Sequence, residues 1–220
     1  MILSTKHKFL LLSNAKCASS ALRQRFCYLI KRALSELEKE RVHSTYDEVE
    51  RDYCVNLKNF YVFSTIRNPW ERMVSLYNYA KPDKSGNEWW QLNPNNIDKP
   101  WGGEYDKNTR CSFEYYLKLP HKFRYACRNM ETMFGNGDVK IYKTEDLDID
   151  VILDDMSLFN NDIASQISRE KLEIIEPNGW HPKKNGIESK NYKEYYTNDS
   201  VIEIIANHYK TDIEYGGYVF

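Results

Sequence analysis

The chain has 220 residues, a length that suits one compact domain with a sizeable core. Hydrophobic residues make up 41% of it and charged residues 29%, which is the composition of a globular protein and excludes a disordered or fibrous one. The formal net charge is −1, which argues against a general nucleic-acid binder but allows a local basic pocket. We expect a single domain over residues 1–220.

The cysteines and the hydropathy of the chain indicate the cellular compartment in which the protein is expected. Five cysteines are spread along the chain with neither a CxxC pair nor the Cys/His spacing of a zinc site. We therefore expect reduced thiols, no metal, and a cytoplasmic protein. No apolar run approaches the roughly 20 residues that span a bilayer, and the charged start does not resemble a signal peptide, so we expect no membrane contact.

The first predicted elements are a strand, a turn and a helix. The apolar run Phe9–Ser13 is typical of a strand buried on both faces of a parallel sheet. A small, polar turn follows at Asn14–Ser20. Apolar residues then recur at steps of three and four from Ala21, which predicts a helix that fades around Glu40.

The same order repeats further along the chain. Residues Phe60–Ile66 are rich in β-formers and predict a second buried strand. Asn68 is a good N-cap, Pro69 suits the first helical position, and Glu71 suits a capping box. Two strand–turn–helix units predict an α/β fold with a central parallel sheet flanked by helices.

Later segments complete the predicted order. Residues 81–111, rich in Trp and Pro, interrupt the pattern and are expected to form a long acceptor-side loop. After this loop we expect a helix capped by Ser112, a third strand, and two more helices (residues 113–116, 139–142, 145–156 and 199–209).

The turn after the first strand has the features of an anion site. A helix N-terminus offers unpaired N–H groups and a favourable dipole, Lys16 adds a positive charge, and Ser19 and Ser20 add hydroxyl donors. The turn is not a Walker A loop, because Lys16 precedes the serines by three and four positions and no Gly is present. Alone, the turn is a weak signal.

The second strand–turn–helix unit strengthens the prediction of an anion site. Arg67 follows a strand, and Arg72 and Ser75 lie on the next helix. Ligands of open α/β sheets gather at the carboxyl ends of the strands, so we expect both turns to open into one crevice. Two anion sites suit a ligand with phosphate at both ends. The alternative is that Arg67 and Arg72 pair with acids such as Glu71.

Several segments resemble the sulfotransferases. Residues 16–20 (Lys-Cys-Ala-Ser-Ser) resemble the family's 5′-phosphosulfate loop, and residues 66–77 resemble its 3′-phosphate segment, with the core Arg-x-Pro-x-x-x-x-x-Ser. Residues 112–115, 142–147 and 191–218 resemble, in order, later parts of the carbohydrate-type members (the Golgi or bacterial-like branch). The likeness spans nearly the whole chain and implies a P-loop-like fold.

The resemblance implies a donor and roles for matching residues. The donor would be 3′-phosphoadenosine 5′-phosphosulfate (PAPS), and no metal would be needed. Lys16 would neutralise the leaving phosphate, and the rest of its loop would hold the 5′-phosphate (Cys17, Ala18, Ser19 and Ser20). Arg67 and Ser75 would grip the 3′-phosphate. Ala15 and Ala18 stand where the family often has Pro and Gly, and Ala adopts positive φ less readily than Gly.

The acceptor hydroxyl requires a base. Similar carbohydrate sulfotransferases place a His or Glu between the two donor motifs, and His43 occupies a comparable stretch. Glu48 and Glu50 are nearby substitutes, and His181 is a weaker candidate. A solvated histidine without a catalytic role is the equally weighted alternative for His43.

The leading interpretation is therefore a PAPS-dependent sulfotransferase that acts on a glycan or another hydroxyl-bearing acceptor. One alternative is a P-loop-like kinase that uses ATP and magnesium, although the order of Lys and Ser argues against it. Another is a binding module that keeps the fold without turnover.

Overall fold

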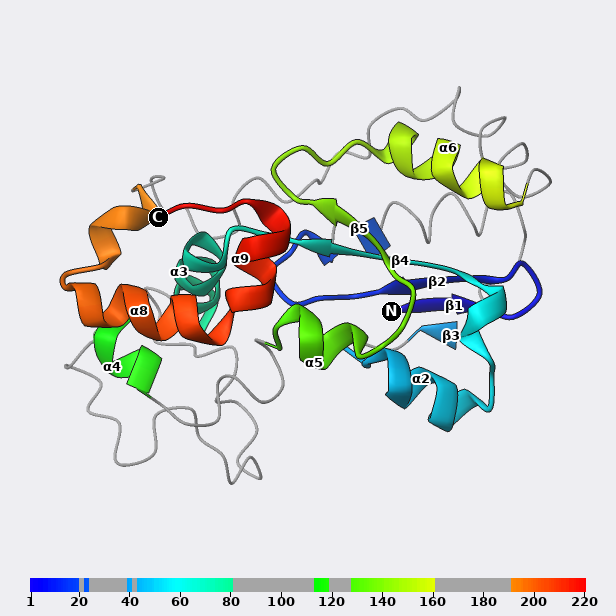
Figure 1. Ribbon diagram of the computed structural model, residues 1–220, viewed down its shortest axis with the longest axis horizontal. Helices are drawn as coiled ribbons and strands as arrows, with labels where there is room; N and C mark the ends of the chain where they lie inside the picture. The colour runs from blue at the N-terminus through cyan, green and yellow to red at the C-terminus, as the bar shows by residue number, and fades with distance from the viewer. Residues whose placement is uncertain (20–21, 24–38, 41–42, 81–112, 119–127, 161–190) are drawn as a thin grey trace, which may run out of the picture. The chain divides into compact units, whose positions relative to one another are not determined.

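The computed structural model describes residues 1–19, 22–23, 39–40, 43–80, 113–118, 128–160 and 191–220. The chain divides into two compact units, each built from two stretches of sequence. The first contains Met1–Arg67 and Met130–Trp180, and the second contains Asn68–Asn129 and His181–Phe220. The first holds the sheet of Figure 1, and the second is helical in its described residues.

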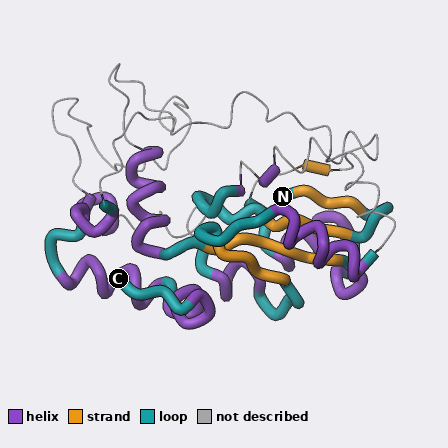
Figure 2. Tube along the Cα trace, turned by 90° about the horizontal axis from the view of Figure 1, so that it is seen from above, coloured by secondary structure: helices purple, strands orange, loops and turns teal. Residues whose placement is uncertain are grey.

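The first unit is built on a five-stranded sheet with the order β3-β1-β2-β4-β5. Strands β2, β4 and β5 are parallel, while β1 runs antiparallel to both of its neighbours. The strands run side by side in Figure 2. Their bounds are Ile2–Ser4 (β1), Phe9–Leu12 (β2), Lys39–Glu40 (β3), Tyr61–Ile66 (β4) and Lys140–Lys143 (β5).

Helices cover this sheet. Helix α6 (Ile149–Phe159) lies on one side of the strands, and α2 (Tyr46–Tyr53) and α5 (Met130–Phe134) lie on the other (Figure 1). A short 3₁₀ helix, η1 (Leu57–Asn59), leads into β4. The apolar face of α6 buries Ile152, Leu153 and Met156 against strand residues such as Phe63, so hydrophobic burial holds the helix on the sheet.

The second unit has its own core. Its elements are α3 (Pro69–Ala80), α4 (Phe113–Lys118), η2 (Tyr192–Tyr195), α8 (Asp199–His208) and α9 (Lys210–Gly216). Asn68 caps α3, because its side-chain oxygen accepts hydrogen bonds from the N–H groups of Trp70 (3.1 Å) and Glu71 (3.2 Å). Trp70 is 4% exposed and belongs to this core, so it is a packing residue.

The α/β fold class is confirmed, with a central sheet that is parallel in β2, β4 and β5 and antiparallel at β1. The three predicted strands correspond to β2, β4 and β5, and helices follow Asn68 and begin at Phe113 and Asp199 as expected. Most of the predicted helix at 21–40, the long loop at 81–111 and the Ser112 cap lie outside the described residues. The single-domain boundary 1–220 stays a prediction.

Several details differ from expectation. Lys39 and Glu40, expected at a helix end, pair with β1 as strand β3. Helix α6 begins at Ile149 rather than near Glu145, because the Asp148 side chain accepts from the Asp150 N–H and caps it there. Strand β1 and helices α2 and α9 were not anticipated.

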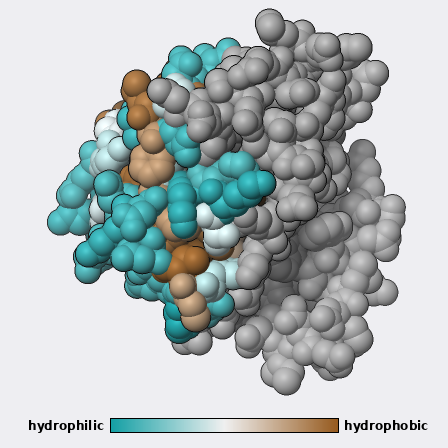
Figure 3. Space-filling model, turned by 90° about the vertical axis from the view of Figure 1, so that its right-hand side faces the viewer, coloured by the Kyte–Doolittle hydropathy of each residue, from teal (hydrophilic) through white to brown (hydrophobic). Residues whose placement is uncertain are grey.

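Among the described residues on the face shown in Figure 3, hydrophilic side chains predominate and apolar areas are small. Exposed apolar side chains on α6 include Leu158, which is 87% exposed, and Phe159, which is 47% exposed. No helix within the described ranges is long and apolar enough to cross a membrane.

Candidate functional site

The turn after β2 has an unusual backbone. Lys16 has φ of 61° and Ala18 has φ of 55°, both in the left-handed region that favours glycine. Helical structure starts immediately afterwards, with Ser19 in the helix and the Leu22 N–H donating to the Ala18 carbonyl at 2.9 Å. Ala18 therefore adopts the positive φ for which related loops use Gly. We call residues 13–19 the donor loop.

The end of β4 reaches this loop. Arg67 Nη1 donates a hydrogen bond to the Lys16 carbonyl oxygen at 3.3 Å. The Thr65 hydroxyl donates to the next carbonyl, that of Cys17, and the Thr65 side chain is buried. The two strand ends that the sequence predicted to cooperate thus lie together, at the carboxyl edge of the parallel strands β2 and β4.

The two cationic side chains influence each other. Burial lowers the pKa of the Lys16 ammonium, and the positive charge of Arg67 lowers this pKa further, while nearby Cys17 acts in the opposite direction. The Arg67 effect on that pKa means that the two charges lie close enough to repel. An anion placed beside both would relieve this repulsion. The strand ends therefore bring two positive charges together, which makes them a candidate anion site.

His43 contacts the same loop. Its Nδ1 lies 2.8 Å from the Ser13 carbonyl oxygen, and a carbonyl only accepts hydrogen bonds, so Nδ1 must carry the proton. In the neutral ring Nε2 is then the unprotonated nitrogen, which is the basic atom of the ring. His43 has φ of 61° and is half-buried, and its role as a base stays a prediction.

The two substitute acids have other contacts. Glu48 Oε2 accepts from the Thr45 N–H at 2.8 Å, in a capping box that begins α2. Glu50 Oε1 accepts from the Leu57 N–H at 2.9 Å. Both carboxylates stabilise local backbone, and their role as substitute bases stays a prediction.

The structure adds two residues that the sequence did not suggest. Thr65 looked like an ordinary β-forming residue, and Ser13 like the end of a strand. The Ser13 hydroxyl is fully buried and has no hydrogen-bond partner among the described residues. A buried hydroxyl without a partner costs free energy, so it is a candidate contact for a ligand.

Of the other predicted site residues, two lie in the donor loop, one lies in the second unit, and two lie outside the described residues. Cys17 is buried in the donor loop, with its thiol 3.5 Å from the Ala15 carbonyl oxygen, and Ser19 is buried at the start of the helix. Ser75 is half-buried on α3 in the second unit, so its part in the site stays a prediction. Ser20 and His181 lie outside the described residues.

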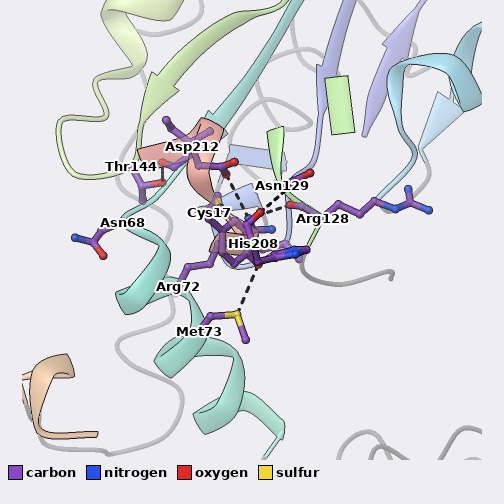
Figure 4. A network of polar contacts seen from close by, with 12 residues as sticks. Cys17, Asn68, Arg72, Met73, Arg128, Asn129, Thr144, His208 and Asp212 are labelled. Atoms are coloured by element: carbon purple, nitrogen blue, oxygen red, sulfur yellow. Dashed lines mark hydrogen bonds and ion pairs between the residues drawn. The ribbon is translucent and has the colours of Figure 1, made fainter. Parts of the chain in front are cut away.

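The sequence predicted that Arg72 belongs to a cationic turn together with Arg67. The structure instead buries Arg72 in the second unit. It is 1% exposed within the second unit, where Nη1 donates to the Arg128 carbonyl at 3.1 Å and lies 3.9 Å from Asp212 Oδ1 (Figure 4). Its guanidinium also lies 5.2 Å from the centre of the Tyr209 ring. Arg72 is therefore a structural residue that neutralises a buried carboxylate.

Comparison with known proteins identifies the family. The family model described as "Sulfotransferase family" matches residues 1–219. No curated protein and no solved structure matches the chain. The α/β sheet with its strand-end loop agrees with the P-loop-like fold of this family. Since the match covers nearly the whole length, the chain belongs to the sulfotransferase family, whose members transfer sulfuryl groups.

Proposed function

We propose that this protein transfers the sulfuryl group of PAPS to a hydroxyl of a carbohydrate. The observation that carries the proposal is the hydrogen bond from Arg67 to the Lys16 carbonyl. It brings the cationic ends of two neighbouring parallel strands together, as a nucleotide with two phosphate sites requires.

The proposed roles follow from charge and position. Lys16 neutralises the negative charge that develops on the leaving phosphate, and Arg67 binds the 3′-phosphate together with Ser75. Residues 17–20 supply amides and hydroxyls to the 5′-phosphate. Catalysis then consists mainly of in-line positioning and charge stabilisation, as in phosphoryl transfer.

The donor loop has features that fit such a ligand. The carbonyls of Ser13, Lys16 and Cys17 each have a side-chain donor, so three partial negative charges are compensated by the protein itself. The buried Ser13 hydroxyl offers a further hydrogen bond. These contacts reduce the repulsion that loop carbonyls would exert on a phosphate.

Competition between nucleotides tests the donor. Calorimetry should show tight binding of 3′-phosphoadenosine 5′-phosphate (PAP) and weak binding of ADP with magnesium. The kinase alternative predicts the reverse preference, and a chelator would then abolish binding. Equal, weak binding of both nucleotides would remove the nucleotide site from the proposal.

The acceptor is tested by transfer of labelled sulfate to a panel of glycans, with other hydroxyl compounds beside them. Incorporation into a glycan supports the proposal, whereas tight PAP binding without transfer to any acceptor favours the binding-module alternative. The cytoplasmic location stays a prediction, which cell fractionation tests.

His43 is the proposed general base. Replacing it by Asn, whose Nδ2 takes the position of the histidine Nδ1, keeps a donor toward the Ser13 carbonyl but removes the basic nitrogen, so His43→Asn should reduce turnover by about 100-fold or more while PAP affinity stays within about twofold. The measurements are steady-state kinetics and calorimetry. Full activity in this variant would assign the base to another residue.

A further inference from the structure

Two side chains from the end of β4 contact successive carbonyls of the donor loop. Arg67 Nη1 donates to the Lys16 oxygen at 3.3 Å, and Thr65 Oγ1 donates to the Cys17 oxygen. Thr65 is 1% exposed and two residues before Arg67. Arg67 already has a proposed role toward the nucleotide, whereas Thr65 has none.

The orientation of the Cys17 carbonyl matters for an anion site. In a trans peptide the C=O and the following N–H point in opposite directions, and no described peptide bond is cis. Holding the Cys17 oxygen at Thr65 therefore turns the Ala18 N–H to the other side. An anion site needs N–H groups facing the ligand and carbonyls facing away from it.

The loop conformation also needs external support. Cys17 lies between Lys16 and Ala18, and both neighbours have positive φ without being glycine. Such conformations persist only where surrounding contacts fix them. The buried hydroxyl of Thr65 is one such contact, and it acts on the peptide between Cys17 and Ala18.

We propose that Thr65 is a positioning residue for sulfuryl transfer, because its hydroxyl fixes the Cys17–Ala18 peptide of the donor loop in its anion-binding orientation. This inference rests on the proposed function for its effect on donor binding. Its effect on the loop itself is independent of any ligand. The two parts can therefore be measured separately.

The chain offers a matched control one residue away. Ser64 is fully buried in β4, and its hydroxyl donates to the Leu12 carbonyl at 2.7 Å. This is the same kind of buried hydroxyl–carbonyl bond, but it ties β4 to strand β2 instead of the loop. Ser64→Ala therefore reports the cost of losing a buried hydroxyl bond in this strand while the contacts to the Lys16 and Cys17 carbonyls stay in place.

The first measurement uses the protein alone. Cys17 is fully buried and Cys54 is exposed, so alkylation followed by mass spectrometry reports loop opening at Cys17 with Cys54 as an internal reference. Thr65→Val should raise the Cys17 alkylation rate by about tenfold, the effect of losing one buried hydrogen bond. Thr65→Ser and Ser64→Ala should stay within about twofold of the wild type.

The second measurement concerns the donor. Thr65→Val should weaken PAP binding and lower kcat by about tenfold each, because a displaced loop loses both contacts and alignment. Thr65→Ser should restore most of both, and Ser64→Ala should leave them nearly unchanged. Urea unfolding of all variants separates these effects from general destabilisation.

Two outcomes would overturn the inference. One is a Thr65→Val variant whose Cys17 alkylation equals that of the wild type. The other is a variant that binds PAP and turns over normally although its stability is reduced, which would make Thr65 a purely structural residue. If wild-type protein failed to bind PAP, the proposed donor would be wrong, while the alkylation result would still decide the role of Thr65 in the loop.

Discussion

At the level of single residues, three of the five described non-glycine residues with positive φ lie in the donor loop or contact it, while Lys8 and Cys54 lie elsewhere in the chain. Lys16, Ala18 and His43 all have positive φ, and none of them is glycine. Each such residue costs roughly 1–2 kcal/mol relative to a relaxed backbone, and such residues cluster at functional sites. Hydrogen bonds to the Ser13, Lys16 and Cys17 carbonyls oppose this cost.

Ala18 allows a direct test of this strain. Ala18→Gly removes the Cβ that disfavours φ of 55° but makes the unfolded chain more flexible, so we expect a net gain in stability of roughly 0.5–1 kcal/mol. Urea unfolding measures it. Ala15, which has no positive φ, is the control, and Ala15→Gly should lower stability by a similar amount. A destabilised Ala18→Gly variant would show that the strain is relieved elsewhere.

The sequence allowed prediction of the site residues whose role depends on charge and strand-end position. Lys16 and Arg67 were predicted because a cation after a buried strand is visible in the sequence, and the structure brings them into contact. Thr65, which contacts the same loop, was not predicted because a threonine in a strand looks like a β-former. The predicted place of Arg72 in a cationic turn was wrong. Its partner Asp212 lies far along the chain, and only the folded structure shows that contact.

Elements were predictable where local pattern and burial agree. Strands β2 and β4 are buried on both faces, so each gives a continuous apolar run. Strand β1 has three residues and depends on pairing with β2, which no local pattern reveals. Helix α2 is short and mostly polar, and its capping box of Thr45 and Glu48 was the signal that could have identified it.

Helices α3 and α9 are joined by the buried pair of Arg72 and Asp212. Removing one partner leaves an uncompensated buried charge, so Arg72→Met should lower the free energy of unfolding by about 3–5 kcal/mol. Urea unfolding of the intact protein measures this loss. Replacing both residues by apolar ones should recover part of the stability.

An exposed pair on α9 provides the control for this prediction. Lys210 and Glu214 lie 3.9 Å apart and are both well exposed, so Lys210→Met should change the free energy of unfolding by less than about 1 kcal/mol. If Arg72→Met cost no more than this control, the buried pair would not be what stabilises the second unit.

For the whole molecule, local charge matters more than net charge. The chain carries −1 overall, yet Lys16 and Arg67 lie close enough to repel. A bound polyanion favours the protonated form of Lys16 and therefore raises its pKa. Ligand binding and proton binding are thus coupled at this site, which predicts how the donor affinity depends on pH.

The affinity for PAP should fall as pH rises from the lowered pKa of Lys16 in the free protein toward 10.5, the ordinary pKa of a lysine. In this window the free protein has lost the proton that the complex retains, so binding takes up a proton. Calorimetry in buffers with different ionisation enthalpies detects this uptake, and Lys16→Met should abolish it.

The stability of the unliganded protein should follow the opposite trend. Because the pKa of Lys16 is lower in the folded than in the unfolded state, the unfolded chain binds more protons between the two pKa values, and the free energy of unfolding gains a contribution as pH rises through that window. Other lysines and tyrosines titrate there too, so the difference between wild type and Lys16→Met isolates this contribution. The Lys16 contribution to stability would then rise with pH while the Lys16 contribution to nucleotide affinity falls, and parallel pH dependences of these two contributions would contradict the assignment of Lys16 to the anion site.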